Sequence, residues 1–318
     1  MKRTMITAAM IAVILTVLPV WAQTEADFEV KQNHDNTLII TDYTGRVKDV
    51  VIPDTLYGLK VTQISSEAFA YKELTSVVIP DAITEIGGRS YEIPGSFQGN
   101  KLTKVTFGKG LKTIGVNAFR DNHTLTKIEF PDSLIRIENN AFLDCGLTNI
   151  VFGKGLQTID ANAFRSNMIT KLTLPVGLQE IRDNAFSNNG ITELILPVGL
   201  KKIQRNAFAF NQIRALIIPN GVTQILDGAF TGNPIETLVI PSSLAEYKEH
   251  TSLSLFIGIS KNVFTHHQNL TRVTLPEGLI YSVMEYGNNF DKGLVNFYIN
   301  QNRAAGTYVK RGPIWTKE

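Results

Sequence analysis

Apolar residues recur along the chain with a fixed spacing, which is clearest for a phenylalanine that stands late in each unit. From Phe97 to Phe230 the successive distances are 22, 23, 22, 22, 22 and 22 residues. Such regularity is typical of a solenoid, in which each unit packs only against its two neighbours. We therefore expect a stack in the core made by Phe119, Phe142, Phe164, Phe186, Phe208 and Phe230, with outlying copies at Phe69, Phe264 and Phe290.

Each unit begins with a short alternation of apolar and polar residues. In residues 191–197, the period of two places Glu193 and Ile195 outward. The inward positions of this unit are Ile191, Leu194 and Leu196. Pro197 has no N–H for a hydrogen-bonded ladder, so it ends the strand. The start of each unit is therefore predicted to be one strand of a parallel sheet.

The second part of each unit carries another inward-facing segment, such as the one containing Leu200 and Ile203. A turn then follows, which in this unit is Asn206–Phe208. Stacked units of this kind predict a β-rich, right-handed solenoid with a parallel β-sheet on one face and short helical or irregular turns opposite. Strand positions counted from Val47 through Leu294 predict about eleven coils of 22–23 residues.

An asparagine follows the phenylalanine by three residues in most units. The chain turns inward there, and a side-chain amide can hydrogen bond backbone groups that the turn leaves unpaired. We expect a structural ladder formed by Asn100, Asn122, Asn167, Asn189, Asn211 and Asn233. Cys145, the only cysteine, stands at the same position after Phe142. It is interpreted as a buried substitute for asparagine, and the alternative is a reactive thiol.

These units resemble the leucine-rich repeats of the BspA type, which occur in exported bacterial proteins. The resemblance includes the entry segment "LIITDYTGRVKDVVIPDTLYGLKVTQISSEAF" at 38–69. The segment "FYINQNRAAGTYVKRGPIW" at 297–315 is similar to the closing segment of spirochaete members. The resemblance implies a leucine-rich-repeat fold, a role in adhesion to host matrix or cells and hence in virulence, and partners of the fibronectin type.

The first 22 residues have the features of a cleaved secretory signal peptide. Lys2 and Arg3 precede an apolar run at 6–17, and a plausible cleavage site ends at Ala22. The alternative is an uncleaved membrane anchor, but the run is shorter than the ~20 residues that span a bilayer. We expect an exported protein with no transmembrane segment in the mature chain, placed at the cell surface, in the medium or in the periplasm.

The mature chain is expected to contain two caps and a solenoid. Residues 23–46 are predicted to form the N-terminal cap and residues 47–293 the solenoid. Insertions near 87–95 and 245–260 lengthen two of the steps between phenylalanines. Residues 294–318 are predicted to supply the last strand and a C-terminal cap that uses Phe297, Tyr308 and Trp315.

Charge and cysteine content exclude several classes of partner. Without residues 1–22 the chain has 29 basic and 29 acidic residues, because Lys2 and Arg3 are two of the 31 basic residues. A neutral chain gives no electrostatic argument for nucleic acid or for anionic membranes. One cysteine cannot form an intramolecular disulfide, so packing must stabilise the fold.

Few residues suggest catalysis or metal binding. "FGKGLKT" at 107–113 lacks the order of a phosphate loop and is interpreted as a repeat corner with Gly108 in place of proline. The pair His266 and His267 lacks supporting carboxylate or cysteine ligands and is interpreted as part of a turn. We expect no cofactor, no metal and no enzyme, although the insertion at 245–262 leaves a hydrolase site open as an alternative.

The outward positions of the predicted strands differ along the chain. Lys104, Lys127 and Lys171 mark the early part, whereas the later part carries an apolar row. The members of this row are Val151, Ile195, Ile217 and Val239, with Thr173 as an interruption. An apolar row with a polar rim is typical of a protein-binding surface. The alternative is that β-branched residues simply suit strands.

These observations favour an exported, non-catalytic, protein-binding repeat protein, with surface adhesion as the expected role. A periplasmic structural or assembly protein is the first alternative, and a hydrolase with a site in the insertion is the second. A regular array offers a large shallow surface for proteins or matrix polymers, with no deep pocket for a small molecule.

Overall fold

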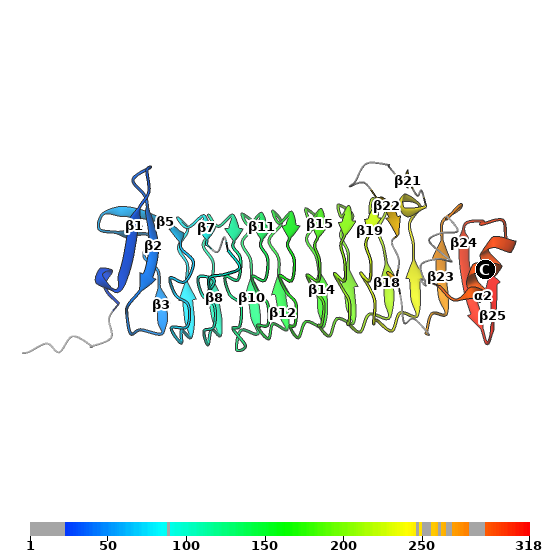
Figure 1. Ribbon diagram of the computed structural model, residues 1–318, viewed down its shortest axis with the longest axis horizontal. Helices are drawn as coiled ribbons and strands as arrows, with labels where there is room; N and C mark the ends of the chain where they lie inside the picture. Colours follow the sequence, from blue (N-terminus) through cyan, green and yellow to red (C-terminus); the bar gives the residue numbers. More distant parts are fainter. Residues whose placement is uncertain are drawn as a thin grey trace, which may run out of the picture.

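The computed structural model describes residues 23–87, 90–245, 248–249, 256–259, 262–264, 269–279 and 290–318. The predicted signal peptide, His266 and His267, and most of the second insertion lie outside these residues, and with them the hydrolase alternative. The described chain forms one long solenoid whose coils follow the sequence from one end to the other (Figure 1).

One side of the solenoid, which we call the strand face, is formed by three-residue strands that precede the proline or glycine corners. Their outward side chains are exposed or half-buried and their middle side chain points inward, as the period of two predicts. The strands are parallel, and each pairs with its equivalent one coil away. They are β3 (Asp49–Val51), β6 (Ser76–Val78), β8 (Lys104–Thr106), β10 (Lys127–Glu129), β12 (Asn149–Val151), β14 (Lys171–Thr173), β16 (Glu193–Ile195), β18 (Ala215–Ile217) and β20 (Thr237–Val239).

The second inward-facing segment of each unit forms another parallel sheet, which the sequence analysis does not predict. Its isoleucines stack in register, for example Ile181 beside Ile203 and Ile159. Among the described residues this sheet has 13 strands, with antiparallel pairs only where β1, β4 and β21 join it, and it runs along the opposite edge in Figure 1. Its two-residue strands are β7 (Glu85–Ile86), β9 (Thr113–Ile114), β11 (Arg136–Ile137), β13 (Thr158–Ile159), β15 (Glu180–Ile181), β17 (Lys202–Ile203) and β19 (Gln224–Ile225).

The repeated phenylalanines form a continuous stack in the core. Neighbouring rings from Phe97 to Phe230 lie 5.0 to 5.5 Å apart, centroid to centroid, and their planes are within 8° of parallel. All of them are fully buried. Burial of each ring is worth about 1.5–3 kcal/mol, so the stack contributes substantially to cohesion between coils.

The backbone conformation explains why asparagine begins each Asn-Ala-Phe turn. Its φ lies between 53° and 59° in Asn117, Asn140, Asn162, Asn184 and Asn206. This left-handed region strains most side chains but is tolerated by asparagine and glycine. Gly228 replaces the asparagine at the same position, with a φ of 67°. Glu67 holds the position in the unit of Phe69 with a φ of 63°, so the turn favours asparagine and glycine but tolerates another side chain.

At the N-terminal end, an antiparallel hairpin closes the 13-stranded sheet. The 3-10 helix η1 (Glu25–Asp27) precedes β1 (Phe28–Gln32), which pairs with β2 (Leu38–Tyr43). β2 then pairs in parallel with β5 (Leu59–Ile64), to which β4 (Thr55–Leu56) is also joined. Tyr43 stacks on Phe69 at 5.4 Å, so the hairpin continues the aromatic stack outward.

The register across the second insertion is fixed by pairing in the described residues. After η2 (Ser242–Leu244) and β21 (Lys248–Glu249), β22 (Phe256–Ile259) pairs with β19 and places Ile259 beside Ile225. Phe264 stacks on Phe230 at 5.9 Å. The extra residues therefore lie between Leu244 and Ile259, inside one coil.

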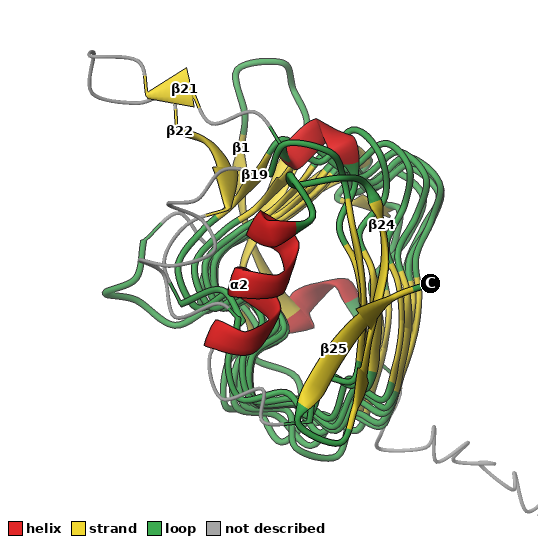
Figure 2. Cartoon of the chain, turned by 90° about the vertical axis from the view of Figure 1, so that its right-hand side faces the viewer, coloured by secondary structure: helices red, strands yellow, loops and turns green. Residues whose placement is uncertain are grey.

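At the C-terminal end, the prediction of a last strand at Leu294 is wrong. Leu294 lies in the helix α2 (Lys292–Asn300), whose buried residues are Leu294, Val295 and Tyr298. This spacing is helical, and the Asp291 side chain caps the helix by accepting a hydrogen bond from Leu294 N. Seen along the solenoid, α2 lies across the end of the core (Figure 2).

The strand face ends in antiparallel strands. β23 (Arg272–Leu275) pairs with β20, then β24 (Gly306–Arg311) and β25 (Ile314–Lys317) follow in antiparallel order. Tyr308 and Trp315 are buried, and the Trp315 Nε1 donates to Asp291 at 3.2 Å. Phe297 packs edge-on against Tyr308 at 6.0 Å. The two ends of the solenoid thus carry hairpins on different sheets.

Candidate functional site

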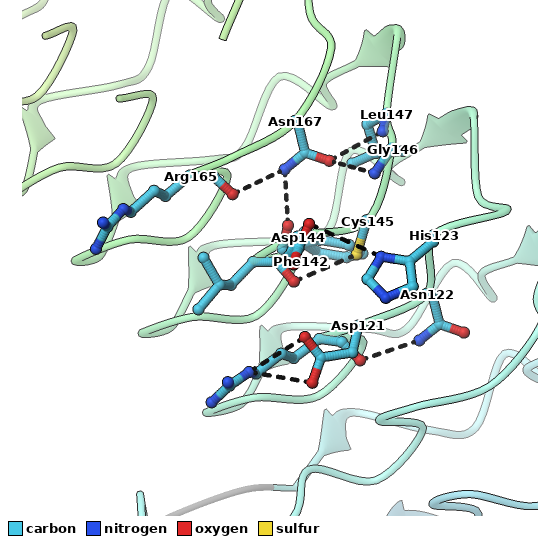
Figure 3. A network of polar contacts seen from close by, with 12 residues as sticks. Asp121, Asn122, His123, Phe142, Asp144, Cys145, Gly146, Leu147, Arg165 and Asn167 are labelled. Atoms are coloured by element: carbon cyan, nitrogen blue, oxygen red, sulfur yellow. Dashed lines mark hydrogen bonds and ion pairs between the residues drawn. The ribbon is translucent and has the colours of Figure 1, made fainter. Parts of the chain in front are cut away.

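The asparagine ladder joins each coil to the coil before it. Asn167 Nδ2 donates to the carbonyl oxygens of Phe142 and Phe164, at 2.8 and 3.0 Å. Its Oδ1 accepts from the backbone N–H of Gly146 and Leu147, at 3.0 and 2.9 Å (Figure 3). One amide therefore satisfies backbone groups of two coils. The same donor pattern recurs at Asn100, Asn122, Asn189, Asn211 and Asn233.

Cys145 occupies the ladder position and is fully buried. Its Sγ lies 3.0 Å from the Phe119 carbonyl oxygen and can donate there, but a thiol cannot supply the oxygen acceptor of an asparagine. The coil before it is the one with 23 residues, and in that coil Leu125 N donates to Asn122 O at 2.9 Å. The extra residue thus removes the need for the missing acceptor. Burial raises the pKa of the Cys145 thiol to about 12, so the group is structural.

The ladder and the phenylalanine stack leave the strand face free to vary. Ile195 and Ile217 are 62% and 67% exposed there, and Val151 is 48% exposed. Val239 is only half-buried and lies opposite Ile217 in the register of β18 and β20. Val151 is separated from Ile195 by the coil of Thr173, which pairs with Ile195. The structure therefore brings Ile195, Ile217 and Val239 together on successive coils, with Val151 apart from them.

A shallow groove adjoins these residues near the C-terminal end of the strand face. It has a volume of about 560 Å³ and is lined by Ile217 and Val239 together with the corner residues Pro219, Pro241 and Pro276. Its lining is mostly apolar, and one wall continues to Ala305 beyond α2. An apolar hollow beside exposed apolar side chains can receive a side chain of a partner protein.

The three lysines of the early strand face are exposed, and two of them have carboxylate partners. Lys127 Nζ lies 2.7 Å from Glu129 on its own strand. Lys171 Nζ lies 2.8 Å from Glu193 on the next coil. Lys104 has no carboxylate partner among the described residues. Exposed pairs of this kind contribute little to stability, about 0–1 kcal/mol each.

The repeat pattern also matches a known sequence profile. The profile of the BspA type leucine rich repeat region, in 6 copies, matches residues 44–94, 62–145, 94–209 and 135–252. The chain belongs to this BspA-type leucine-rich repeat family. No curated protein matches the sequence.

Solved structures with a similar fold are also bacterial leucine-rich repeat proteins. One from Bacteroides ovatus ATCC 8483 is 22% identical with a TM-score of 0.63, over 80% of this chain and 65% of that chain. The present chain thus spans less than two thirds of that protein. A T. pallidum leucine-rich repeat protein is 23% identical, over 85% and 96% of the two chains, with a TM-score of 0.45. A leucine rich cell surface protein of Faecalibacterium prausnitzii A2-165 is 20% identical, over 70% and 89%, with a TM-score of 0.37.

In this BspA-type chain, the sequence analysis missed two exposed residues at the corners. Val176 and Val198 follow the prolines of successive coils and are 71% and 75% exposed. Their corners stack, since a Cβ on Gly199 would lie 2.6 Å from the Val176 carbonyl oxygen. The repeated Pro-Val-Gly at 175–177 and 197–199 was the available signal. With Ile195, Ile217 and Val239 these valines form what we call the apolar patch.

The analysis also missed an apolar pair at the N-terminal end of the same face. Val51 and Val78 are outward residues of β3 and β6, paired in register, and are 58% and 39% exposed. These two strands precede the first lysine of the face, at Lys104, and were not among the outward positions considered from the sequence. Apolar outward residues occur at both ends of the face, and the lysines lie between them.

One buried carboxylate was not foreseen either. Asp160 is fully buried, with its Oδ2 2.6 Å from Arg136 Nη2 and its Oδ1 3.3 Å from Arg182 Nε. The hydrogen bond to Asp160 raises the pKa of Arg136 above its usual range. A carboxylate held between two guanidinium groups is a structural ion pair between coils.

Two absences apply only to the described part of the chain. No group of three or more His, Cys, Asp or Glu side chains is placed there to hold a metal ion. No helix found there has the length and apolar character needed to cross a membrane.

Proposed function

We propose that this BspA-type protein binds a protein partner through the apolar patch of its strand face. The observation that carries the proposal is the exposure of Ile195, Ile217, Val176 and Val198 on neighbouring coils beside the groove at Ile217 and Val239. Solitary exposed apolar residues are ordinary, but several on neighbouring coils, with two of the row lining a hollow, are typical of an interface.

The partner is proposed to be a macromolecule because the site is broad and shallow. The groove is open and apolar, and the surrounding strands present a flat surface of alternating side chains. Small-molecule sites usually enclose most of the ligand surface, which this geometry does not provide. Binding by a flat repeat face is common in solenoid proteins.

Within this general binding role, the more specific proposal is adhesion at the cell surface after export. It rests on the family, on the signal-like residues 1–22 and on one similar protein that is named as a cell surface protein. Extracellular matrix proteins such as fibronectin are the first partners to test. No contact in the structure favours fibronectin over another matrix protein.

The experiment measures binding of the purified protein to immobilised matrix proteins by surface plasmon resonance. We expect the wild type to bind and the variant Ile195→Glu/Ile217→Glu to lose at least about tenfold in affinity, because two carboxylates enter a desolvated contact. Equal binding by both proteins contradicts the proposed site. Absence of binding to every matrix protein contradicts the adhesion proposal.

A matched control changes the same chemistry elsewhere on the same face. Val51→Glu/Val78→Glu also places two carboxylates at outward positions of adjacent strands, far from the apolar patch along the solenoid. Its affinity should stay within about twofold of the wild type. Circular dichroism of both variants shows whether the fold is kept.

A further inference from the structure

The sheet on the strand face is interrupted between β8 and β10. Residues 90–245 are all described, and no backbone hydrogen bond joins these two strands, although β8 pairs with β6 and β10 pairs with β12. The inward residue Val105 is consequently only half-buried, whereas its equivalent Ile128 is 1% exposed. The interruption therefore opens the strand face toward the core.

The corner that follows β8 packs tightly on the previous coil. A Cβ on Gly108 would lie 2.2 Å from the Pro80 carbonyl oxygen, so only glycine allows this close approach. Gly153 makes the same approach to Pro131, and the sheet is interrupted after its strand too. The interruption between β16 and β18 has no such glycine, so a close-packed corner glycine accompanies two of the three interruptions in residues 90–245.

A cleft of about 630 Å³ occupies the opening between β8 and β10. Its apolar lining includes Val105, Phe107, Ile128 and Phe130, and its polar lining includes Lys104, Lys109, Lys127 and Glu129. Clefts of about 300–1,000 Å³ are large enough to hold a ligand group. The apolar floor and the charged rim set the chemistry of what can enter.

The floor of the cleft excludes insertion of a complete strand. The rings of Phe107 and Phe130 are stacked beneath it with centroids 5.7 Å apart. A strand inserted between β8 and β10 would need about 9.6 Å, which is twice the usual spacing of neighbouring strands. The occupant must therefore lie over the strands and lower one side chain into the cleft.

The rim of the cleft is positively charged. Lys127 is neutralised by Glu129 at 2.7 Å, whereas the ammonium groups of Lys104 and Lys109 form no ion pair within the described ranges, and Asp81 is held by the Lys109 backbone N–H at 2.7 Å. Two uncompensated ammonium groups at the edge of an apolar hollow favour an anionic ligand with an apolar part. The apolar floor and the nearby Glu129 disfavour a sulfated polysaccharide, which is polar throughout and densely negative.

We propose that this cleft is a second binding site, which takes an acidic segment of a partner protein. An apolar side chain of the segment lies against Val105 and Phe130, and its carboxylates pair with Lys104 and Lys109. The site is independent of the apolar patch, because it lies on other coils and uses charge where the patch uses apolar area alone.

The test pans a phage-displayed library of random nonapeptides on the purified protein and measures the enriched peptides by fluorescence anisotropy. The cleft variant is Lys104→Gln/Lys109→Gln. The matched control is Lys154→Gln/Lys171→Gln. Lys154 is the corner lysine equivalent to Lys109 two coils further on, and Lys171 is the strand lysine equivalent to Lys104 three coils further on. Both variants keep the backbone and the apolar floor.

We expect enriched peptides that combine Asp or Glu with Leu, Phe or another large apolar residue. Their Kd should rise at least about tenfold in the cleft variant and stay within about twofold in the control. Affinity should fall as salt is added, because the charges at the rim are exposed. Binding should persist in Ile195→Glu/Ile217→Glu, which tests the apolar patch separately.

Several outcomes overturn the proposal. Enriched peptides without acidic residues, or equal affinity for the cleft variant, would exclude a charge-selecting site. Peptides lost only in the Ile195→Glu/Ile217→Glu variant would support the apolar patch and reject the cleft. Heparin binding that depends on Lys104 and Lys109, with no peptide enriched, would assign the cleft to a polysaccharide instead.

Discussion

The turn side of the solenoid and its strand face obey different constraints. On the turn side, the ladder asparagine and its hydrogen bonds to backbone carbonyls recur from Asn122 to Asn233, with Cys145 as the one substitution. On the strand face, the outward residue changes from Thr106 to Val151 to Ile217 over equivalent positions. On the turn side, side chains must be buried and must pair with backbone N–H and C=O groups, which restricts the residue types. The strand face meets solvent, so its outward positions are free to acquire binding residues.

This difference separates stability from binding. Substitutions in the core and the ladder should weaken folding, and substitutions at outward strand positions should affect partners.

Phe164→Ala should have the largest effect on stability. Phe164 is fully buried and stacks on Phe142 and Phe186, each with centroids 5.3 Å apart. Truncation leaves a cavity between three coils, so the free energy of unfolding should fall by about 3–5 kcal/mol. Urea unfolding followed by circular dichroism measures the change. A loss below about 1 kcal/mol would show that the stack does not hold the coils together.

Asn167→Ala should cost somewhat less, about 2–4 kcal/mol, because it leaves buried backbone groups without partners. The affected groups include the Phe142 carbonyl and the Leu147 N–H. Cys145→Ala, at the same ladder position, should cost only about 1 kcal/mol at pH 7, since the thiol is a weak donor and Leu125 N has its own acceptor. Equal costs at the two positions would contradict our explanation of the cysteine.

The effect of Cys145→Ala should also depend on pH. Burial raises the pKa of the folded thiol to about 12, above the unfolded value of about 8.5. The folded protein then retains a proton that the unfolded chain loses, so the thiol's contribution is complete below pH ~8.5 and is lost as pH rises toward 12. By pH 10 the wild type should lose about 2 kcal/mol relative to the variant, which reverses their order. Urea unfolding of both proteins at pH 7 and pH 10 tests this reversal.

Ile195→Glu/Ile217→Glu should change stability least, by about 0.5 kcal/mol or less for each residue. Both side chains are outward and more than half exposed, so little buried area is lost. Thermal unfolding of this variant beside Val51→Glu/Val78→Glu checks the expectation. A large loss in the first variant alone would mean that the apolar patch packs against the protein itself.

The sequence predicts the repeated interior well because that part must satisfy the same constraints in each coil. Spacing alone places Phe164 in the stack and Asn167 in the turn. The second sheet is missed because strands of two residues, such as Lys202–Ile203, are too short for an alternation to be visible.

The errors of the sequence prediction lie where the repeat ends, or at positions that the repeat leaves free to vary. Leu294 continues the phase of the preceding strands, yet the local cap at Asp291 and the spacing of Val295 and Tyr298 favour a helix. Val176 and Val198 stand at corners, where a pattern search expects polar residues. The cleft at β8 follows from which strands pair across neighbouring coils, which is a three-dimensional relation that no local pattern expresses.

The most direct test of the separation measures two quantities on one variant, Ile195→Glu/Ile217→Glu. Urea unfolding gives its stability, and surface plasmon resonance gives its binding to a matrix protein that the wild type binds. We predict an unfolding free energy within about 1 kcal/mol of the wild type together with at least about a tenfold loss of affinity. Unchanged affinity, or a loss of stability as large as that of Phe164→Ala, would contradict the assignment of binding to the strand face.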